Sequence, residues 1–548
     1  MKPARRTKKV SVKKTAVRRE AVKLAKLEAK ISQLNDELER VRYELEAATA
    51  TADHFANSYF WVIVTKYRQL LNSHLPNGTR RRAVWEWMFR RATKPLRRTH
   101  SEYGVTAADH TQTKPPQGVN SPLDNATFRS SEAPLPKITY VMHFPPGSTE
   151  SGGTGKHCRL LCSFVDDFVK YVIYPQEYPR EHSLIVEEYS PFGGKEKEFS
   201  YFSGARKTAL ISNKETEQTI GKILTEHKPD IVHFQHLLGL PLNSIRIAKE
   251  HSLKIVITLH DAYLLCPDFT ILEMGEKHCD GCTDLHRCDL CLQTRYNLKQ
   301  GFQQKWREAC RAMLELADMI IVPSKYQRDL YARTLNIDAN RVTVIEHVIP
   351  SHPITLTNKP DDLSTLRVGF VGHIVDKAKG RDVILQLLKE NKDDSIEWHF
   401  FGEGSDIRGH LRDAKIEPRG KLIFHGYYDE GKLPSTLTNA NITVVVIPSI
   451  KYESYGYVLT EVWQAGIPVI AANIGAIGER IMENGGGWVY PLGSNAHSVL
   501  ELIAKNRTDP MEYKSKVTEV RSMKHQTFSE YVSRYKRIYS DLISRPRS

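Results

Sequence analysis

Two series of short, β-branched hydrophobic runs alternate with helical stretches through the greater part of the chain. The first series falls at 138–143, 231–235, 254–259, 319–322 and 342–345, and the second at 367–371, 397–401, 422–425, 442–447 and 469–472. Strands that alternate with helices are typical of parallel sheets. The pattern predicts an α/β protein with two facing Rossmann-like, doubly wound domains. Since such sheets bind ligands at the carboxyl ends of their strands, we expect the site in the cleft between them.

The N-terminal region has a different pattern. Apolar residues recur there at alternating spacings of three and four, at Leu24, Leu27, Ile31, Leu34, Leu38, Val41 and Leu45. This spacing predicts a short coiled coil over 20–50, which would join a second copy or a partner, although packing within the chain gives the same pattern. Residues 51–93 are predicted to be a helical, amphipathic segment, with an interfacial helix as one interpretation. Residues 94–135 are polar and aperiodic, which indicates a linker.

Breaks in the pattern define the remaining predicted boundaries, and 548 residues are enough for several folding units. The first Rossmann-like domain covers 136–350 and carries a cysteine-rich insertion at 266–291. A second linker, rich in Pro, Asp and Ser, covers 351–364. The second Rossmann-like domain covers 365–508, and C-terminal helices cover 509–548.

The net charge of +14 is concentrated at the N-terminus, where residues 1–19 hold nine Lys or Arg and no acid, which leaves +5 for the rest. The plainest interpretation is a disordered basic arm. An anionic membrane surface would attract it, and so would nucleic acid, although the nucleic-acid hypothesis rests on the arm alone. No run is long and apolar enough to span a bilayer, and the N-terminus lacks the apolar core of a signal peptide. We therefore expect a cytoplasmic protein, peripheral at the inner face of the membrane if the arm binds lipid.

Candidate chemistry in the first domain lies after two of its strands. A glycine-rich turn that includes Gly152 and Gly153 follows the first strand and leads into a helical stretch. Glycines allow a ligand to approach the backbone, and a helix start offers free N–H groups to an anion. The turn lacks the spacing of a P-loop. His260 ends another predicted strand with Asp261 beside it, at the edge where open α/β sheets bind ligands.

Candidate phosphate and sugar ligands gather in the second domain. Gly372 and His373 end its first strand, and Lys379 follows at a glycine turn, where its charge could neutralise a diphosphate. Glu453 and Glu461 stand eight residues apart across a loop-to-helix transition, so both can face one ligand and accept hydrogen bonds from sugar hydroxyls. Between them, Ser454, Tyr455 and Gly456 can present backbone N–H groups to phosphate.

These motifs together resemble the retaining, GT-B-fold glycosyltransferases of family 4. The glutamate pair is similar to the family's E-x7-E motif, the stretch 465–471 to its G-x-P-V strand, and the resemblance runs from about residue 136 to the C-terminus. It implies that Glu453 contacts the transferred sugar and Glu461 the ribose of the donor. His373 stands where the family usually has an arginine, which puts the strength of diphosphate binding in doubt. Ala476 replaces a frequent glycine.

The resemblance also implies roles in the first domain and a reaction. Gly153 would lie beneath the diphosphate held by Lys379, and His260 would approach the sugar. Residues 136–350 would bind the acceptor, residues 365–508 the nucleotide sugar, and the last helix would cross back to the first domain. A sugar would pass from a nucleoside diphosphate to a hydroxyl of a glycan or glycolipid, with retention of configuration, in surface polysaccharide biosynthesis. No cofactor or catalytic metal is implied.

Four cysteines of the insertion have the spacing of metal ligands, at Cys279, Cys282, Cys288 and Cys291. Four thiolates satisfy tetrahedral zinc, so a structural zinc site is one hypothesis. Free or redox-active thiols and an iron–sulfur cluster are the alternatives. A subset of family 4 enzymes resembles this His-Asp, Cys-Pro and cysteine-rich arrangement.

Two other functions fit the same sequence. One is a sugar phosphorylase or synthase of the same fold, which would use phosphate or a soluble sugar. The other is a coiled-coil scaffold with a degenerate module that only binds glycans or nucleotides. The His373 departure favours the scaffold, whereas the intact pair Glu453 and Glu461, together with Lys379, favours catalysis.

Overall fold

The computed structural model describes residues 134–546 apart from 147, 149–151, 177–182, 192–193, 204–209, 275–276, 280, 282–283, 350–362 and 430. The predicted basic arm, coiled coil and amphipathic segment lie outside the described residues, as does nearly all of the first linker. Leu135–Ser548 belong to one compact unit. No described helix combines the length and hydrophobicity that crossing a bilayer requires.

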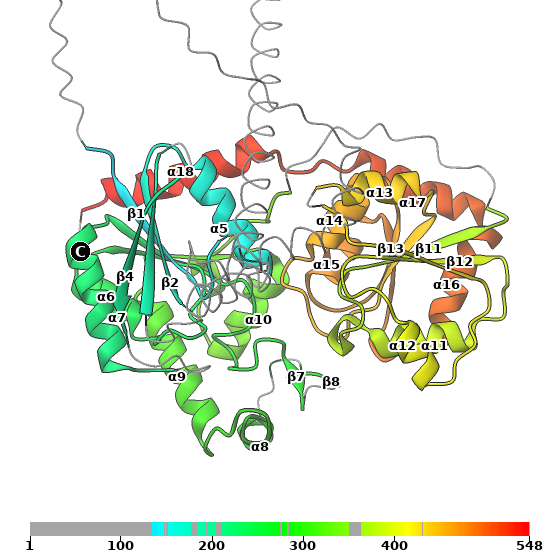
Figure 1. The fold of residues 1–548 in the computed structure, drawn as a ribbon, viewed down its shortest axis with the longest axis horizontal. Helices are drawn as coiled ribbons and strands as arrows, with labels where there is room; N and C mark the ends of the chain where they lie inside the picture. The colour runs from blue at the N-terminus through cyan, green and yellow to red at the C-terminus, as the bar shows by residue number, and fades with distance from the viewer. Residues whose placement is uncertain are drawn as a thin grey trace, which may run out of the picture. The chain divides into compact units, whose positions relative to one another are not determined.

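The first lobe is built on an eight-stranded sheet in the order β10-β9-β6-β5-β1-β2-β3-β4 (Figure 1). Neighbours from β10 to β2 pair in parallel, whereas β3 and β4 extend the sheet as antiparallel strands. The strands are β1 (Lys137–Val141), β2 (Val169–Pro175), β3 (Ser183–Tyr189), β4 (Lys195–Phe202), β5 (Ile231–Phe234), β6 (Lys254–Thr258), β9 (Met319–Val322) and β10 (Val342–Val344). Its inner strands, such as β5 and β6, are buried along their whole length because helices cover both faces.

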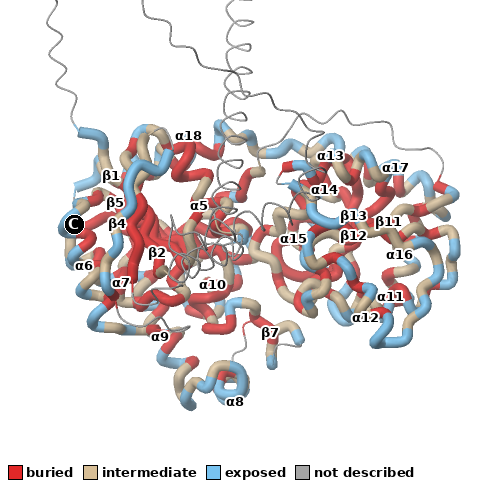
Figure 2. The backbone as a smooth tube through the Cα atoms, in the orientation of Figure 1, coloured by how far each residue is buried: buried red, intermediate tan, exposed pale blue. Residues whose placement is uncertain are grey.

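The second lobe contains a six-stranded, fully parallel sheet in the order β13-β12-β11-β14-β15-β16. Its strands are β11 (Leu366–Val371), β12 (Ile396–Phe401), β13 (Lys421–Gly426), β14 (Val444–Ile447), β15 (Val469–Ala472) and β16 (Gly487–Tyr490). Two parallel Rossmann-like sheets are the architecture that the hydrophobic pattern predicted, so the GT-B fold class is confirmed. The burial colours in Figure 2 show the inner strands of the sheets as buried, whereas the edge strand β4 is exposed.

Helices connect the strands of each sheet. In the first lobe they are α5 (Gly152–Phe164), α6 (Lys214–His227), α7 (Ser244–Glu250), α8 (Leu285–Tyr296), α9 (Phe302–Glu315), α10 (Lys325–Leu335) and the 3-10 turn η2 (Ala339–Arg341). In the second they are the 3-10 turn η3 (Lys377–Lys379), α11 (Arg381–Glu390), α12 (Arg408–Asp413), α13 (Leu433–Asn439), α14 (Tyr457–Gln464), α15 (Gly475–Asn484), α16 (Ala496–Thr508) and α17 (Pro510–Ser522). The insertion adds a small hairpin of β7 (Leu272–Glu273) and β8 (Lys277–His278).

Six strands of the described residues were not predicted, namely β2, β3, β4 and β16 of the two main sheets and β7 and β8 of the small hairpin. The strand β4 is an exposed edge strand with the sequence KEKEFSYF, so it carries no hydrophobic run to detect. The strand β16 has only four residues. Pairing with neighbouring strands decides such elements. The strands β2 (VKYVIYP) and β3 (SLIVEEY) do carry hydrophobic runs, which the prediction overlooked.

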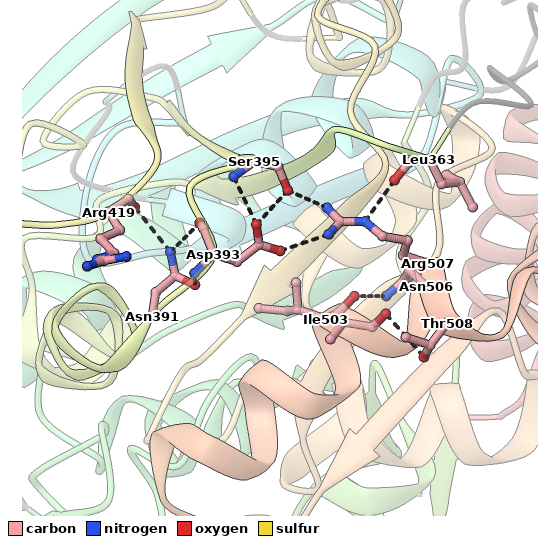
Figure 3. A network of polar contacts seen from close by, with 10 residues as sticks. Leu363, Asn391, Asp393, Ser395, Arg419, Ile503, Asn506, Arg507 and Thr508 are labelled. Atoms are coloured by element: carbon pink, nitrogen blue, oxygen red, sulfur yellow. Dashed lines mark hydrogen bonds and ion pairs between the residues drawn. The ribbon is translucent and has the colours of Figure 1, made fainter.

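A network of polar contacts ties α16 to the loop before β12 (Figure 3). The guanidinium of Arg507 donates to the carbonyl of Leu363 at 3.0 Å, to Asp393 at 2.9 Å and to the hydroxyl of Ser395 at 2.8 Å. Asp393 also accepts from the backbone N–H of Ser395 at 2.9 Å. Arginine suits this position because its planar fork can serve several acceptors at once.

The last helix, α18 (Phe528–Ser544), packs on the first lobe although it follows the second lobe in sequence (Figure 1). A capping box at Thr527 and Glu530 defines its start. Tyr531, Tyr535 and Tyr539 are buried in one hydrophobic cluster with residues of β1, β2 and α5. The hydroxyl of Tyr539 lies 2.8 Å from Nδ1 of His233 on β5. The first lobe therefore completes its core with the end of the chain.

Replacement of Tyr535 by alanine tests this dependence. The ring is fully buried, so its loss leaves a cavity and should lower the free energy of unfolding by about 3–5 kcal/mol. Chemical denaturation monitored by circular dichroism measures the change. Met511→Ala, at a side chain that is 79% exposed on α17, should leave stability nearly unchanged. Equal stabilities of the two variants would contradict a core role for α18.

Candidate functional site

A cleft of about 710 Å³ is lined by residues of both lobes. All the residues predicted to bind or act on a donor line this one cleft. They are Gly152, Gly153, His260, Gly372, His373, Lys379, Glu453, Ser454, Tyr455, Gly456 and Glu461. Gly152 and Glu461 are 309 positions apart in the sequence, and both line this cleft.

Two loops of the second lobe are held against each other at the base of the cleft. Gly380 follows the turn η3, and its φ of +91° favours glycine. A Cβ at Gly380 would lie 2.1 Å from the carbonyl oxygen of Pro448, so a side chain is excluded there. The N–H of Ile450 donates to the carbonyl of Ala378 at 3.1 Å. This contact brings the lysine of one loop to the glutamate of the other.

Lys379 and Glu453 form an ion pair, with 2.5 Å between Nζ and Oε1. Burial alone would raise the pKa of Glu453, but the charges of Lys379 and Lys451 outweigh it and hold the pKa below its usual value. Glu453 is therefore an ionised acceptor at neutral pH. Both side chains keep part of their surface in the cleft, 34% for Lys379 and 22% for Glu453, so a ligand can reach them.

The loop between β14 and α14 takes its shape from the start of α15. A Cβ at Gly475 would lie 2.8 Å from the backbone N and O of Glu453, and the N–H of Ala476 donates to the carbonyl of Glu453 at 2.9 Å. The departure at Ala476 is therefore harmless to this contact, because the backbone N–H makes it. Glu461, on α14, is 5% exposed and lines the cleft one turn into the helix.

Gly456 and Tyr455 differ in what they offer. Gly456, with φ +79°, precedes the first residue of α14, where unpaired N–H groups favour an anion. The side chain of Tyr455 is buried, with the guanidinium carbon of Arg480 4.2 Å from the ring centroid. Tyr455 can therefore bind a ligand through its backbone N–H, while its ring packs in the core.

The glycine turn of the first lobe meets the second lobe directly. The helix α5 begins at Gly152, and the ring of Tyr457 would lie 2.8 Å from a Cβ at Gly153. The hydroxyl of Tyr457 donates to the carbonyl of Gly153 at 3.4 Å. A side chain at position 153 would therefore displace the Tyr457 ring, so glycine favours this contact between the lobes.

His373 lies exposed in the cleft at the end of β11. Its ring occupies the space above Gly404, where a Cβ would meet Nδ1 at 2.2 Å. The imidazole is shorter than the arginine usual in the family and lacks the planar fork of N–H donors with which a guanidinium binds a diphosphate. The predicted effect on diphosphate binding stays a prediction.

His260 is held by a residue that the sequence analysis missed. Its Nε2 lies 2.7 Å from Oε1 of Gln235, which follows β5, and both side chains are buried. An amide oxygen can only accept, so Nε2 of His260 carries the proton and Nδ1 is left as an acceptor. Burial and the neighbouring histidines lower the pKa of His260, which keeps the ring neutral.

His347 was also missed, and it joins the two lobes at the site. Its ring stacks on Tyr457 of the second lobe at 3° and 5.3 Å, and on His260 of the first lobe at 18° and 5.3 Å. His347 follows β10 and Gln235 follows β5, so the rule that strand ends carry ligand-binding residues could have found both.

The cysteine cluster gives a mixed result. Cys279, Cys288 and Cys291 line a small cavity beside the cleft together with Cys266, which was not predicted, whereas Cys282 lies outside the described residues. The backbone N–H of Met274 donates to the sulfur of Cys291 at 3.2 Å. Among the described residues, no three His, Cys, Asp or Glu side chains are placed to hold a metal ion. The zinc site therefore stays a prediction.

Comparison with protein families covers both lobes. Residues 172–351 match the family described as Glycosyltransferase Family 4, and residues 359–521 match the family described as Glycosyl transferases group 1. The chain belongs to the group 1 and family 4 glycosyltransferases.

Individual relatives are distant. A phosphatidyl-myo-inositol mannosyltransferase of Mycobacterium leprae is 23% identical over 44% of this chain and 62% of that protein. A putative colanic acid biosynthesis glycosyl transferase, WcaC of Escherichia coli, is 24% identical over 51% of this chain and 68% of that protein. Three other curated relatives are matched over 31% to 62% of their own length. The solved structure of a sucrose-phosphate synthase from Thermosynechococcus elongatus is 14% identical, with a TM-score of 0.49 over 75% of this chain and 99% of that one.

The contact between Gln235 and His260 predicts a change in pH dependence. Gln235→Glu places a negative charge beside the N–H of Nε2 and so raises the pKa of His260. As the pH falls, the ring therefore becomes protonated at a higher pH than in the wild type. If the neutral ring is needed, the acid limb of kcat/KM should move upward by about one pH unit. Gln235→Met removes the acceptor without adding charge, so it should lower the rate without moving that limb upward. An unchanged acid limb in Gln235→Glu would show that the charge state of His260 does not matter.

Proposed function

We propose that this protein is a retaining glycosyltransferase that moves a sugar from a nucleoside diphosphate to a hydroxyl of a glycan or glycolipid, in surface polysaccharide biosynthesis. The observation that carries the proposal is the shared cleft, which brings Lys379, Glu453 and Glu461 of one lobe to the glycine turn and His260 of the other. Family membership supports the reaction class. Distant relatives named for a mannosyltransferase and for colanic acid biosynthesis support the substrate class.

The donor is proposed to bind mainly to the second lobe. Lys379 and the N–H groups at the start of α14 face the diphosphate, and Glu461 accepts from the ribose. Glu453 accepts from a hydroxyl of the transferred sugar, and the bare Nδ1 of His260 accepts from another. Lys379 and the amide dipoles stabilise the charge that develops on the leaving diphosphate, while the other groups position the donor.

The ion pair of Lys379 and Glu453 prepares the site for this donor. An ammonium group has three N–H donors, so Lys379 can keep Glu453 and still bind a phosphate oxygen. The carboxylate keeps one oxygen for the sugar. A single pair of opposite charges thus supplies a cation to the diphosphate and an anion to the sugar, and holds both in place before the donor arrives.

Two N-terminal segments complete the proposal. The basic arm at 1–19 is proposed to attract the anionic inner face of the membrane, where a glycolipid acceptor would lie, and the heptad pattern at 20–50 to join a second copy or a partner. Both segments lie outside the described residues.

Removal of the positive charge of Lys379 tests the proposed glycosyl transfer. In the full-length protein, Lys379→Ala should lower kcat for a nucleotide sugar by about 10²–10³, because one charge opposite the leaving group is lost. The donor is first identified by a thermal-shift screen of UDP-, GDP-, ADP- and dTDP-sugars, since a ligand of the folded state raises its melting temperature.

Lys377→Ala is the matched control. Lys377 lies in the same turn, pairs with Asp382 at 3.9 Å and does not line the cleft, so its loss should change kcat less than twofold. Equal effects of the two variants would refute the role of Lys379. A rate that requires inorganic phosphate would favour the phosphorylase, and donor binding without turnover the scaffold.

The variant Lys379→Ala should also change how donor binding depends on pH. The positive charge of Lys379 helps to hold the pKa of Glu453 down, so its removal raises that pKa. A carboxylate with a raised pKa is protonated at a higher pH, so donor affinity in Lys379→Ala should fall at a higher pH than in the wild type. Calorimetric titration with the donor between pH 4 and pH 8 measures the shift. Parallel affinity profiles would show that Glu453 does not bind the donor.

A further inference from the structure

One exposed aromatic side chain stands in the cleft, and the donor does not account for it. Phe269 is 36% exposed, and among the large apolar side chains exposed in the described residues it alone lines the cleft. It belongs to the cysteine-rich insertion, between β6 and β7, on the first lobe. The lysine and both glutamates assigned to the donor lie on the second lobe, whereas Phe269 lies on the first lobe, to which the family resemblance assigns the acceptor.

Asp268, the residue before Phe269, holds this stretch in place through buried polar contacts. Asp268 is 2% exposed and forms an ion pair with Arg295 of α8, with 2.8 Å between Oδ2 and Nε. Its other carboxylate oxygen accepts from both the N–H and the hydroxyl of Thr270. Asp268 lines the cysteine cavity while Phe269 and Thr270 line the cleft. The insertion therefore presents these two residues to the cleft on a fixed turn.

The backbone after this turn is strained. Ile271 has φ +46°, a conformation that a β-branched residue rarely adopts, and its side chain is 4% exposed. Its N–H donates to the carbonyl of Asp268 at 3.0 Å, and its carbonyl accepts from the N–H of Cys279 at 2.9 Å. Strain of this kind persists only where surrounding contacts impose it, and it concentrates at ligand sites.

We propose that Phe269 and Thr270 form the acceptor subsite and that its ligand is a hexopyranose ring of the acceptor. A pyranose has an apolar face and a rim of hydroxyls. The phenyl face of Phe269 matches the first, while the Thr270 hydroxyl and the Asp261 carboxylate, which also lines the cleft, match the second. An acyl chain would cover the Asp261 carboxylate, whose side chain is 30% exposed, without offering it a hydrogen bond, and removing such a group from water is costly. This inference rests on the proposed glycosyl transfer and names the part of the acceptor that the enzyme recognises.

Saturation-transfer NMR on the full-length protein tests the subsite without requiring turnover. The probes are methyl glucoside, methyl galactoside and methyl mannoside, each with the nucleotide found in the thermal-shift screen, and octyl glucoside. One of the methyl hexosides should give a saturation-transfer signal with the wild type. Phe269→Ala should weaken the binding of that hexoside by about tenfold, and Phe269→Tyr should restore its binding. Phe202→Ala is the control, because Phe202 is an aromatic residue 71% exposed on β4 that does not line the cleft.

Three results would overturn the subsite: binding unchanged in Phe269→Ala, saturation of octyl glucoside through its alkyl chain alone, or no methyl hexoside bound by the wild type. Failure of the proposed function shows separately, as a wild-type protein that releases no nucleotide from any of the four donor sugars. Nucleotide release in the absence of acceptor should be the same in the control Phe202→Ala as in the wild type, since Phe202 does not line the cleft.

Discussion

The candidate site depends on one contact within the second lobe, where the turn η3 packs against the loop between β14 and α14. Gly380 has to be a glycine there because the carbonyl of Pro448 occupies the place of a side chain. That approach sets Lys379 2.5 Å from Glu453. Opposite charges so close hold each other's side chains in position and keep the carboxylate ionised, so the site is organised before any ligand binds.

The first lobe supports the site from two directions. Behind it, the tyrosines of α18 complete the core beneath β1 and β5, so the end of the chain stabilises the lobe that carries His260. Beside it, the insertion that follows His260 turns Phe269 toward the cleft. His347 and Tyr457 then connect the lobes by ring stacking. Closing of such a cleft around a donor would act on these contacts, and lobe closure is a common gating step in enzymes.

The E-x7-E stretch shows how far sequence reasoning reached. The spacing of Glu453 and Glu461 placed both on one face of a loop-to-helix transition, and the structure has both lining the cleft. The rule that ligands bind at strand ends likewise predicted His260 and Gly372, and both line the same cleft. Gln235 and His347 obey the same rule but were missed, because a single polar residue after a strand is too common a signal without its spatial partner. The cysteine spacing brought Cys279, Cys288 and Cys291 to one cavity, which Cys266 also lines, while Cys282 lies outside the described residues.

Local sequence by itself determined the alternation of strands and helices, the two-sheet fold class and the loops that carry the candidate donor ligands, because hydrophobic periodicity and glycine turns act over a few residues. Tertiary structure alone decided the rest. The pairing of Lys379 with Glu453, the hydrogen bond from His260 to Gln235 and the packing of α18 on the first lobe join positions 74, 25 and more than 300 residues apart. Such contacts leave no mark on the spacing of neighbouring residues, so only the folded chain brings them together.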